Sequence, residues 1–179
     1  MANIQTATLA GGCFWCLESA FNSVDGVVKA FAGYAGGQTE QPTYEQVCSG
    51  HTGHAEVVQV NFDADNISYR EILEIFFALH NPTQLNRQGD DIGTQYRGVI
   101  FYHNDEQKQV AAEILNEIVQ EQIWPDPVVT ELTAINNYFQ AEDYHQDYFT
   151  NNPENQYCNM VVAPKLAKFK QKFASRLKV

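Results

Sequence analysis

The segment GGCFWC at residues 11–16 most constrains what this chain of 179 residues can fold into. Residues 4–9 alternate as a strand does and lead into the double glycine, and residues 13–23 place their apolar side chains at helical spacing. The segment therefore predicts a strand, a tight turn and a helix that begins at a thiol. Backbone N–H groups and the positive dipole end at a helix N-terminus favour thiolate, so we expect a lowered pKa for Cys13. The same spacing also fits a glycine turn before a core-facing helix whose cysteines have no chemical role.

Strand and helix patterns alternate along the rest of the chain. Further strands are predicted at residues 27–34, 55–62, 98–103 and 128–134, and helices at residues 43–48, 68–79, 104–122 and 136–149. Residues 81–95 are rich in Gly, Pro, Asn and Asp, which predicts a long loop, and residues 151–158 predict an irregular segment. Loops of that length in a compact domain are usually functional. The pattern indicates mixed α and β structure in one domain that spans residues 1–179.

Composition and charge exclude several classes of protein. A hydrophobic content of 44% fits a globular core, and no apolar run approaches the roughly 18 to 20 residues that span a membrane. The N-terminus has no basic flank followed by an apolar signal core, so we expect a cytoplasmic protein. All 22 acidic residues lie before residue 155, and such an acidic body argues against nucleic-acid binding.

The C-terminal segment concentrates the basic charge. Six of the 11 basic residues fall between Lys165 and Lys178. Apolar residues lie among them at near-helical spacing, at positions 166, 169, 173 and 177. This stripe favours docking of the segment on the acidic body, although the charge alone also fits an anionic partner or a membrane surface.

The four cysteines are best explained by redox chemistry. The chain is long enough to fold without disulfide staples and shows no export signal, which favours transient, catalytic disulfides. Zinc binding by Cys13, Cys16, His51 and His54 is disfavoured, because no second CxxC pair is present and two aromatic residues fill the spacer. We therefore expect no metal and no cofactor. For Cys48 we expect a small buried residue at a helix end.

Four motifs resemble those of the A-type peptide methionine sulfoxide reductases. They are GCFW at residues 12–15, GHAEVV at 53–58, DIGTQYR at 91–97 and AEDYHQ at 141–146. They occur in the same order as in the family. Together with residue 158 they extend over nearly the whole chain, whereas a chance match would be confined to one short motif. The resemblance implies an α+β fold, a two-layer sandwich (an α-β plait) with a mixed sheet and long irregular segments. It also implies reduction of the S-epimer of methionine sulfoxide, free or in proteins, with thioredoxin as reductant, and we expect a monomer.

The resemblance implies a chemical role for each matched residue. Cys13 would attack the sulfoxide sulfur and become a sulfenic acid. Glu56 would donate the proton to the departing oxygen, because partial burial on its strand would keep its carboxyl protonated. Tyr44 and Tyr96 would donate hydrogen bonds to that oxygen. Cys158, in the segment of about residues 150–179, would be the recycling thiol.

Four further residues would bind the substrate. Phe14 and Trp15 lie beside the nucleophile and would form apolar walls for the methyl group. Asp91 and His145 resemble residues that orient the substrate backbone or order water around the sulfur. Asp90, next to Asp91, is the alternative to it in that loop.

The chain also departs from the family pattern. Cys16 stands where the family usually has glycine, Gly98 where it often has serine, and Asn81 where it often has aspartate. Cys16 lies one helical turn from Cys13 and is itself able to resolve the sulfenic acid, leaving Cys158 to relay electrons outward. The sequence leaves the first resolving thiol open.

Two other classes of function fit part of the sequence. A general dithiol–disulfide oxidoreductase would use Cys13 and Cys16, but it would leave the acid, tyrosine and aspartate motifs unexplained. A non-catalytic binding module with a buried cysteine cluster predicts no turnover and no thiolate near neutral pH.

Overall fold

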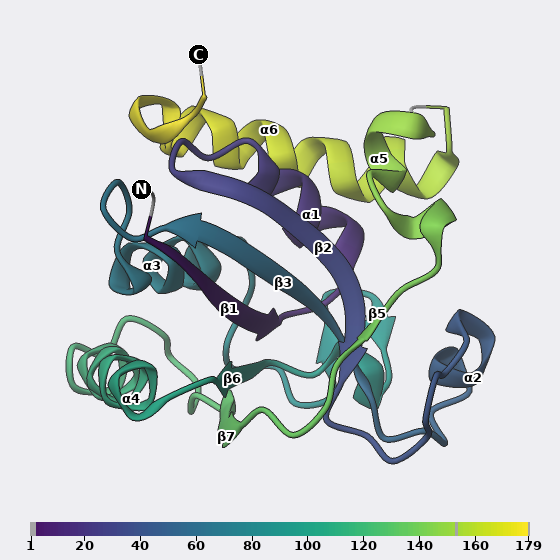
Figure 1. Ribbon diagram of the computed structural model, residues 1–179, viewed down its shortest axis with the longest axis horizontal. Coiled ribbons are helices and arrows are strands. Elements are labelled where there is room, and N and C mark those ends of the chain that lie inside the picture. Colours follow the sequence, from purple (N-terminus) through teal and green to yellow (C-terminus); the bar gives the residue numbers. More distant parts are fainter. Residues whose placement is uncertain (1–2, 153, 179) are drawn as a thin grey trace.

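The computed structural model describes residues 3–152 and 154–178 and is built on a six-stranded mixed sheet (Figure 1). The strand order is β7-β6-β1-β3-β2-β8, in which β6 and β7 run parallel and the other neighbours antiparallel. The strands are β1 (Ile4–Ala10), β2 (Val27–Ala35), β3 (Ala55–Asp63), β6 (Val99–Tyr102), β7 (Glu131–Ala134) and β8 (Phe139–Gln140), and a separate hairpin joins β4 (Arg87–Gln88) to β5 (Asp91–Ile92). The expected α+β class with a mixed sheet is confirmed.

The helices begin where the sequence supplies capping side chains. Ser68 and Asn104 each accept a hydrogen bond from the backbone N–H three residues later, at 3.0 and 2.8 Å. A capping box at Thr43 starts the short helix that carries Tyr44. The α-helices are α1 (Phe14–Asn22), α2 (Tyr44–Cys48), α3 (Tyr69–Leu79), α4 (Asp105–Gln120), α5 (Tyr148–Asn151) and α6 (Ala163–Lys172), with 3₁₀ turns at Thr94–Tyr96, Asp143–His145 and Ala174–Arg176 and a π-helical segment at Cys158–Val162.

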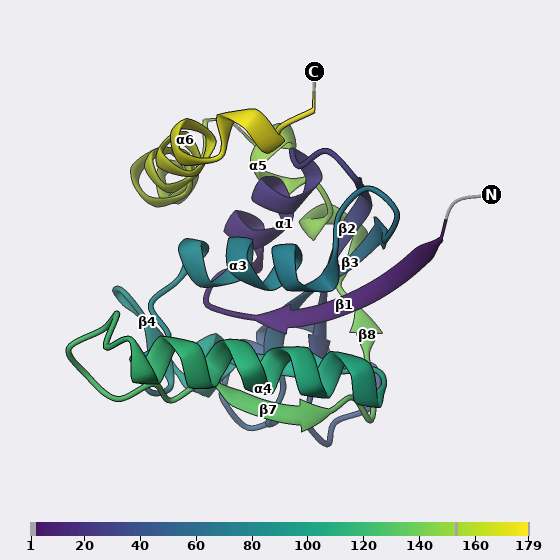
Figure 2. The same cartoon turned by 90° about the vertical axis from the view of Figure 1, so that its left-hand side faces the viewer.

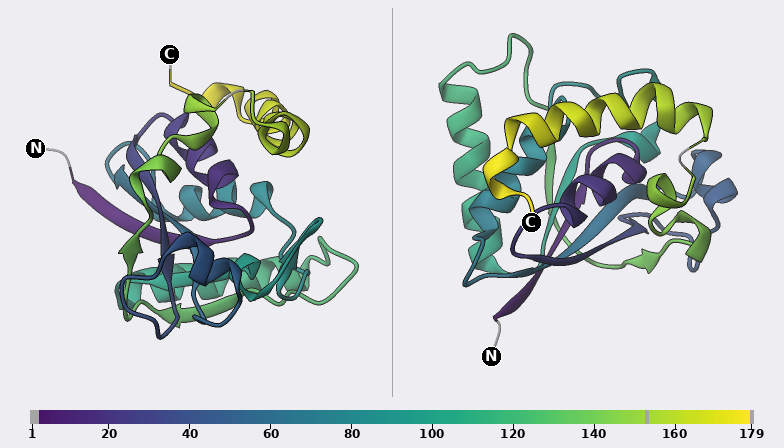
Figure 3. Two further views of the ribbon diagram at one scale, coloured as in Figure 1. Left: turned by 90° about the vertical axis from the view of Figure 1, so that its right-hand side faces the viewer. Right: turned by 90° about the horizontal axis from the view of Figure 1, so that it is seen from above.

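One face of the sheet carries the main core. Helices α1, α3 and α4 cover this face, and α6 lies outside α1 and α3 (Figures 2 and 3). On β3, Val58 and Phe62 point into this core, whereas Val57 packs on the opposite face. Side chains on a strand alternate between its faces, so Glu56 shares the helix-covered face with Val58. This register places the Glu56 carboxyl where α1 begins.

The other face is covered by irregular chain. After β7 at one edge of the sheet, the chain crosses in front of the sheet and rejoins it as β8 at the far edge (Figure 1). Ile135 and Tyr138 of this crossing pack on the apolar residues of that face. The ring of Tyr138 lies so close to Gly33 that a Cβ there would be 2.3 Å from it, so this strand position needs glycine.

The helix expected at residues 136–149 is wrong. The segment contains β8, a 3₁₀ turn and only the start of α5. Its polar side chains bond the exposed edge of β2 instead of supporting a helix. Asn137 accepts from the backbone N–H of Gly36 at 3.0 Å, and Gln146 accepts from the N–H of Ala32 at 3.0 Å. The loop expected at 81–95 likewise contains the β4–β5 hairpin and a 3₁₀ turn.

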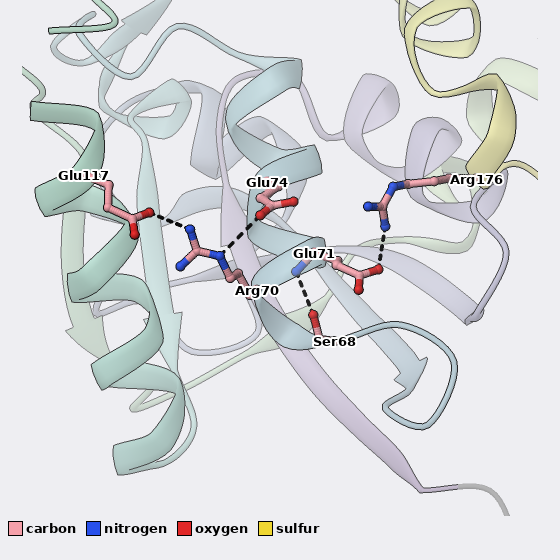
Figure 4. A network of polar contacts seen from close by, with 6 residues as sticks. All are labelled: Ser68, Arg70, Glu71, Glu74, Glu117 and Arg176. Atoms are coloured by element: carbon pink, nitrogen blue, oxygen red, sulfur yellow. Dashed lines mark hydrogen bonds and ion pairs between the residues drawn. The ribbon is translucent and has the colours of Figure 1, made fainter. Parts of the chain in front are cut away.

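The basic C-terminal segment docks on the body, as its apolar stripe predicts. Leu166 and Phe169 of α6 are buried in the main core. Beyond α6, Arg176 forms an ion pair with Glu71 at the start of α3, and Arg70 links α3 to α4 through Glu117 (Figure 4). Of the helices in the described residues, none has the length and apolar character needed to cross a membrane.

Candidate active site

Cys13 occupies the N-cap position of α1, where β1 has just ended. The turn that delivers it depends on Gly12, whose φ is +93°, a conformation that favours glycine. A Cβ on Gly12 would also lie 2.7 Å from the Gln88 side chain. Gln88 is itself fixed, since its amide bonds the backbone of Asn81 at 2.7 and 3.0 Å. The nucleophile is therefore held between the first strand and the β4–β5 hairpin.

Cys13 and Cys16 form a coupled pair of free thiols. Burial raises the pKa of Cys13, and its neighbour Cys16 raises that pKa further. The backbone N–H of Trp15 and the hydroxyl of Tyr157 lower it. The expected lowering for Cys13 is therefore wrong, because desolvation outweighs the helix N-terminus. The hydrogen bond from Cys13 lowers the pKa of Cys16, and the charge of Lys165 on α6 acts in the same direction. Of the two thiols, Cys16 is therefore the one that ionises more readily.

Glu56 is buried, only 1% exposed, at the start of α1. Its Oε1 accepts the backbone N–H of Phe14 at 3.2 Å, and its Oε2 has no hydrogen-bond partner among the described residues. Burial raises the pKa of Glu56 well above its ordinary value, and the nearby Cys13 raises it further, although the Phe14 N–H opposes both. A neutral carboxylic acid beside the reactive thiol follows, as the sequence predicts.

Tyr44 and Tyr96 lie near Glu56 and come from two different segments of the chain. Tyr44 begins α2, and Tyr96 ends the 3₁₀ turn after the β4–β5 hairpin. Burial raises the pKa of both hydroxyls, and the charge of Glu56 is the next cause in each case. Both hydroxyls therefore keep their protons at neutral pH and remain hydrogen-bond donors. The structure brings these two tyrosines together with Glu56.

An aromatic cluster lies beside the nucleophile. Trp15 stacks on Tyr148 with ring centroids 3.9 Å apart, and its Nε1 donates to Nδ1 of His145 at 3.0 Å. The His145 ring also lies 4.4 Å from the ring of Tyr44. Phe14 is fully buried beneath the cluster, whereas Trp15 is partly exposed. Trp15 is thus the aromatic neighbour of Cys13 that a substrate methyl group can reach.

His145 is a buried member of this cluster. Burial lowers its pKa, which keeps the imidazole neutral. Since Nδ1 accepts the Trp15 N–H, the proton of the ring is on Nε2, which has no hydrogen-bond partner among the described residues.

Asp91 and Cys158 are joined through a residue that the sequence analysis did not select. Tyr157 donates its hydroxyl to Asp91 at 2.5 Å and places its ring edge-on against Trp15, 5.7 Å away. It directly precedes Cys158, whose side chain is buried at the start of the π-helical segment. Asp90 is exposed, so Asp91 is the residue of this pair that faces the site.

Glu142 is a second residue that the sequence analysis missed. Its carboxylate accepts the hydroxyl of Tyr34 at 2.9 Å, the backbone N–H of Tyr44 at 2.9 Å and the hydroxyl of Tyr144 at 3.2 Å. It therefore fixes the start of α2 against β2. The only available signal was its place three residues before His145 in the AEDYHQ motif.

Cys48 differs from expectation. It is exposed rather than buried and lies at the end of α2. The short α2 stands away from the main core, so its last residue has no layer to pack against. Within the described residues, no three His, Cys, Asp or Glu side chains are grouped so as to hold a metal ion.

Comparison with known proteins identifies the family of this chain. A family model described as peptide methionine sulfoxide reductase matches residues 5–177. The chain belongs to that family. One relative, the peptide methionine sulfoxide reductase MsrA of Polynucleobacter asymbioticus, is 52% identical over 175 residues that cover 98% of this chain and 92% of the relative. Like other members of the peptide methionine sulfoxide reductase family, the chain is an enzyme that reduces methionine sulfoxide.

Solved structures agree with this assignment. Mxr1 from Saccharomyces cerevisiae in its reduced form is 36% identical and superposes with a TM-score of 0.79, covering 87% of this chain and 89% of that chain. Mxr1 in complex with Trx2 is 25% identical and has a TM-score of 0.55, covering 81% and 84%.

Proposed function

We propose that this reductase acts on the S-epimer of methionine sulfoxide, free or in proteins, through Cys13 and Glu56. The observation that carries the proposal is the buried Glu56 carboxyl, which bonds the Phe14 N–H at the same helix end that holds Cys13. A neutral acid next to a sulfur nucleophile suits a reaction in which an oxygen must leave as it is protonated.

The first step forms a sulfenic acid. The thiolate form of Cys16, which its lowered pKa favours, takes the proton of Cys13 and leaves Cys13 as a thiolate. The Cys13 sulfur then attacks the sulfoxide sulfur, and the sulfoxide oxygen takes the Glu56 proton. As the sulfur–oxygen bond breaks, the oxygen passes to Cys13 as a sulfenic acid and the thioether leaves. Cys13 loses two electrons, the substrate gains them, and Glu56 regains its proton from solvent.

The surrounding side chains bind the substrate. Tyr44 and Tyr96 donate hydrogen bonds to the sulfoxide oxygen, and their raised pKa values keep both donors protonated. Trp15 contacts the substrate methyl group with its partly exposed ring. Asp91 orients the substrate, and His145 holds the Trp15 ring in place through its hydrogen bond.

A second thiol then resolves the sulfenic acid. The Cys16 thiol attacks the Cys13 sulfur, and the hydroxyl leaves as water with the Cys16 proton, which gives a disulfide. Burial raises the pKa of Cys158, and charge on Cys13 raises it further, which supports Cys158 as the thiol that would exchange into that disulfide. Thioredoxin would reduce the resulting bond, a role supported by the Mxr1–Trx2 complex in the same family.

Single-turnover kinetics test the nucleophile. Cys13→Ser should abolish reduction of the S-epimer in the absence of any external reductant, while the folded protein keeps its thiols at the other three cysteine positions. The wild-type protein should reduce the S-epimer and leave the R-epimer unchanged in the same assay. Reduction by Cys13→Ser, or equal reduction of both epimers, would contradict the proposal.

A further inference from the structure

Glu18 is a buried carboxyl that the reaction above does not use. It lies on α1, one helical turn after Trp15, and is 2% exposed. Its Oε1 accepts the backbone N–H of Asp147 at 2.7 Å. The same helix face therefore makes two kinds of contact with one segment, a hydrogen bond at Glu18 and the aromatic stack of Trp15 on Tyr148.

That segment, residues 141–148, is called the strap below. One end is bonded to the edge of β2, where the N–H of Ala141 donates to the carbonyl of Ala32 at 3.0 Å and Gln146 bonds the same residue. The other end contains Asp147, whose φ of 55° is costly for a residue other than glycine. The strap carries His145 between these ends. A conformation of that cost persists only where tertiary contacts hold it, and the bond to Glu18 is one of those contacts.

The charges around Glu18 make this contact sensitive to ionisation. Asp147 faces it from the strap, Lys29 from β2, Lys170 from α6 and Tyr138 from the crossing segment. Lys29 is shared, because it also pairs with the Asp147 carboxylate at 3.5 Å. Burial, with a smaller contribution from Asp147, raises the pKa of Glu18 to about 7, although the Asp147 N–H opposes the shift.

We propose that Glu18 is a positioning residue, which in its neutral form fastens the strap to α1 and so fixes His145 and Tyr148 against Trp15. The proposal rests on the proposed function only in that Trp15 contacts substrate. Neutral Glu18 accepts the Asp147 N–H without adding a second negative charge beside the Asp147 carboxylate. Ionised Glu18 would be a buried charge next to the half-exposed Lys29–Asp147 pair. Release of the strap would expose that charge to water, so ionisation favours release.

Fluorescence of Trp15 reports the strap without any turnover. In a Trp124→Phe background Trp15 is the remaining tryptophan, and its emission depends on its stack with Tyr148 and its bond to His145. We expect this emission to change between pH 6 and pH 8 as Glu18 ionises. Glu18→Gln keeps a neutral acceptor for the Asp147 N–H, so its emission should stay at the low-pH value. Because Glu18→Gln keeps all four thiols, the difference between the two proteins isolates Glu18.

Steady-state kinetics give the second measurement. Glu18→Leu leaves the Asp147 N–H unpaired, and KM should rise about tenfold with a change in kcat of less than twofold. Glu18→Gln should retain the wild-type KM at pH 6 and lack its rise toward pH 8. Glu113→Gln, which changes an exposed carboxyl on α4, is the matched control and should match wild type in both measurements.

Three outcomes would overturn the proposal. The first is a Glu18→Leu variant whose Trp15 emission and KM equal those of wild type. The second is a Glu18→Gln variant whose emission changes with pH as that of wild type does. The third is a Glu18→Gln variant whose emission and KM at pH 6 equal those of Glu18→Leu. If Glu18→Leu does not fold, the pH profile of Glu18→Gln still decides. If the wild-type protein reduces methionine sulfoxide but the pH profile of Glu18→Gln equals that of wild type, the proposed function stands and only the role of Glu18 is excluded.

Discussion

At the scale of single residues, Glu56 is buried and has one carboxyl oxygen without a hydrogen-bond partner among the described residues. Its Oε1 is occupied by the Phe14 N–H, while Oε2 faces the site without a partner among the described residues. The proton on Oε2 is therefore available to a substrate oxygen. The protein backbone fixes one oxygen of the acid and leaves the other for chemistry.

Glu56→Gln should slow the single-turnover chemical step by about 10² to 10⁴, the usual contribution of a general acid. An amide keeps the bond to Phe14 but has no acidic proton, so substrate affinity should change little. The wild-type rate should fall as pH rises through the raised pKa of Glu56, because the acid must be protonated to act. The variant should lack that falling limb. Stopped-flow measurement across pH checks this, with Glu113→Gln as the exposed control; a wild-type rate in Glu56→Gln would assign the proton to another group.

Gly12→Ala tests the turn that delivers the nucleophile. The φ of +93° at Gly12 disfavours a side chain, and so does the Gln88 side chain, which would lie 2.7 Å from the added Cβ. We expect a loss of about 1–3 kcal/mol in the free energy of unfolding and a strong fall in activity, since Cys13 is the next residue. Gly50→Ala is the matched control, because Gly50 also has a positive φ, +81°, but open space around it. Denaturant unfolding should show the smaller loss for Gly50→Ala; equal losses would exclude a contribution from Gln88.

At the scale of elements, the π-helical segment that begins at Cys158 would control recycling through the role that we propose for this thiol. π-helical turns are often found at functional sites. Cys158 is fully buried, its N–H donates to Asn155 at 3.1 Å, and the neighbouring Tyr157 is bonded to Asp91. A protein reductant cannot reach a buried sulfur, so the segment must open before thioredoxin can act.

Cys158→Ser should keep single-turnover reduction and lose most of its steady-state activity with thioredoxin. If Cys16 resolves first, substrate-oxidised Cys158→Ser should contain a Cys13–Cys16 disulfide that peptide mapping detects. If it does not, a dimedone-type probe should capture a sulfenic acid at Cys13. Full thioredoxin-coupled turnover in Cys158→Ser would eliminate an essential role for Cys158.

Hydrogen exchange should show the opening directly. Amides of residues 155–162 should exchange faster in substrate-oxidised protein than in reduced protein, because disulfide exchange at Cys158 requires its buried side chain to become accessible. Amides of β3, in the middle of the sheet, serve as the internal control and should not change. Equal protection of residues 155–162 in both redox states would argue against the opening.

At the scale of the whole molecule, buried acids and buried imidazoles give the stability opposite dependences on pH. Burial raises the pKa of Glu18 from 4.5 to about 7, so the folded state binds its proton more tightly than the unfolded state does. This contribution is fully present below pH 4.5 and is lost as pH rises to 7. Burial lowers the pKa of His80 from 6.5 to about 4, so its contribution is lost as pH falls from 6.5 to 4. Each amounts to about 3 kcal/mol at most.

The two contributions should nearly cancel between pH 4.5 and 6.5, so together they change the wild-type stability little in that range. Glu18→Gln removes the contribution that falls with pH, so its free energy of unfolding should rise over the same range. Denaturant unfolding at several pH values measures both profiles. A Glu18→Gln profile parallel to that of wild type would mean that Glu18 does not titrate in this window.

The sequence by itself determined the features that depend on neighbouring residues. The caps at Ser68 and Asn104, the strand–turn–helix around Cys13 and the alternation that turns Glu56 toward the helices all follow from side chains within a few positions. Such patterns are local, since hydrogen-bond geometry and strand pleat act over one or two turns of chain. The resemblance of four motifs then indicated the chemistry.

Only the tertiary structure decided the features that depend on which elements meet. Residues 136–149 do not form one helix because Asn137 bonds Gly36, just after β2, and Gln146 bonds Ala32 on β2, each more than a hundred residues away. Tyr157 reaches the site because Asp91 lies opposite it. The direction of the pKa shift at Cys13 depends on burial, because burial raises the pKa by more than the helix N-terminus lowers it. Desolvation and long-range hydrogen bonds arise from packing, and no local pattern encodes them.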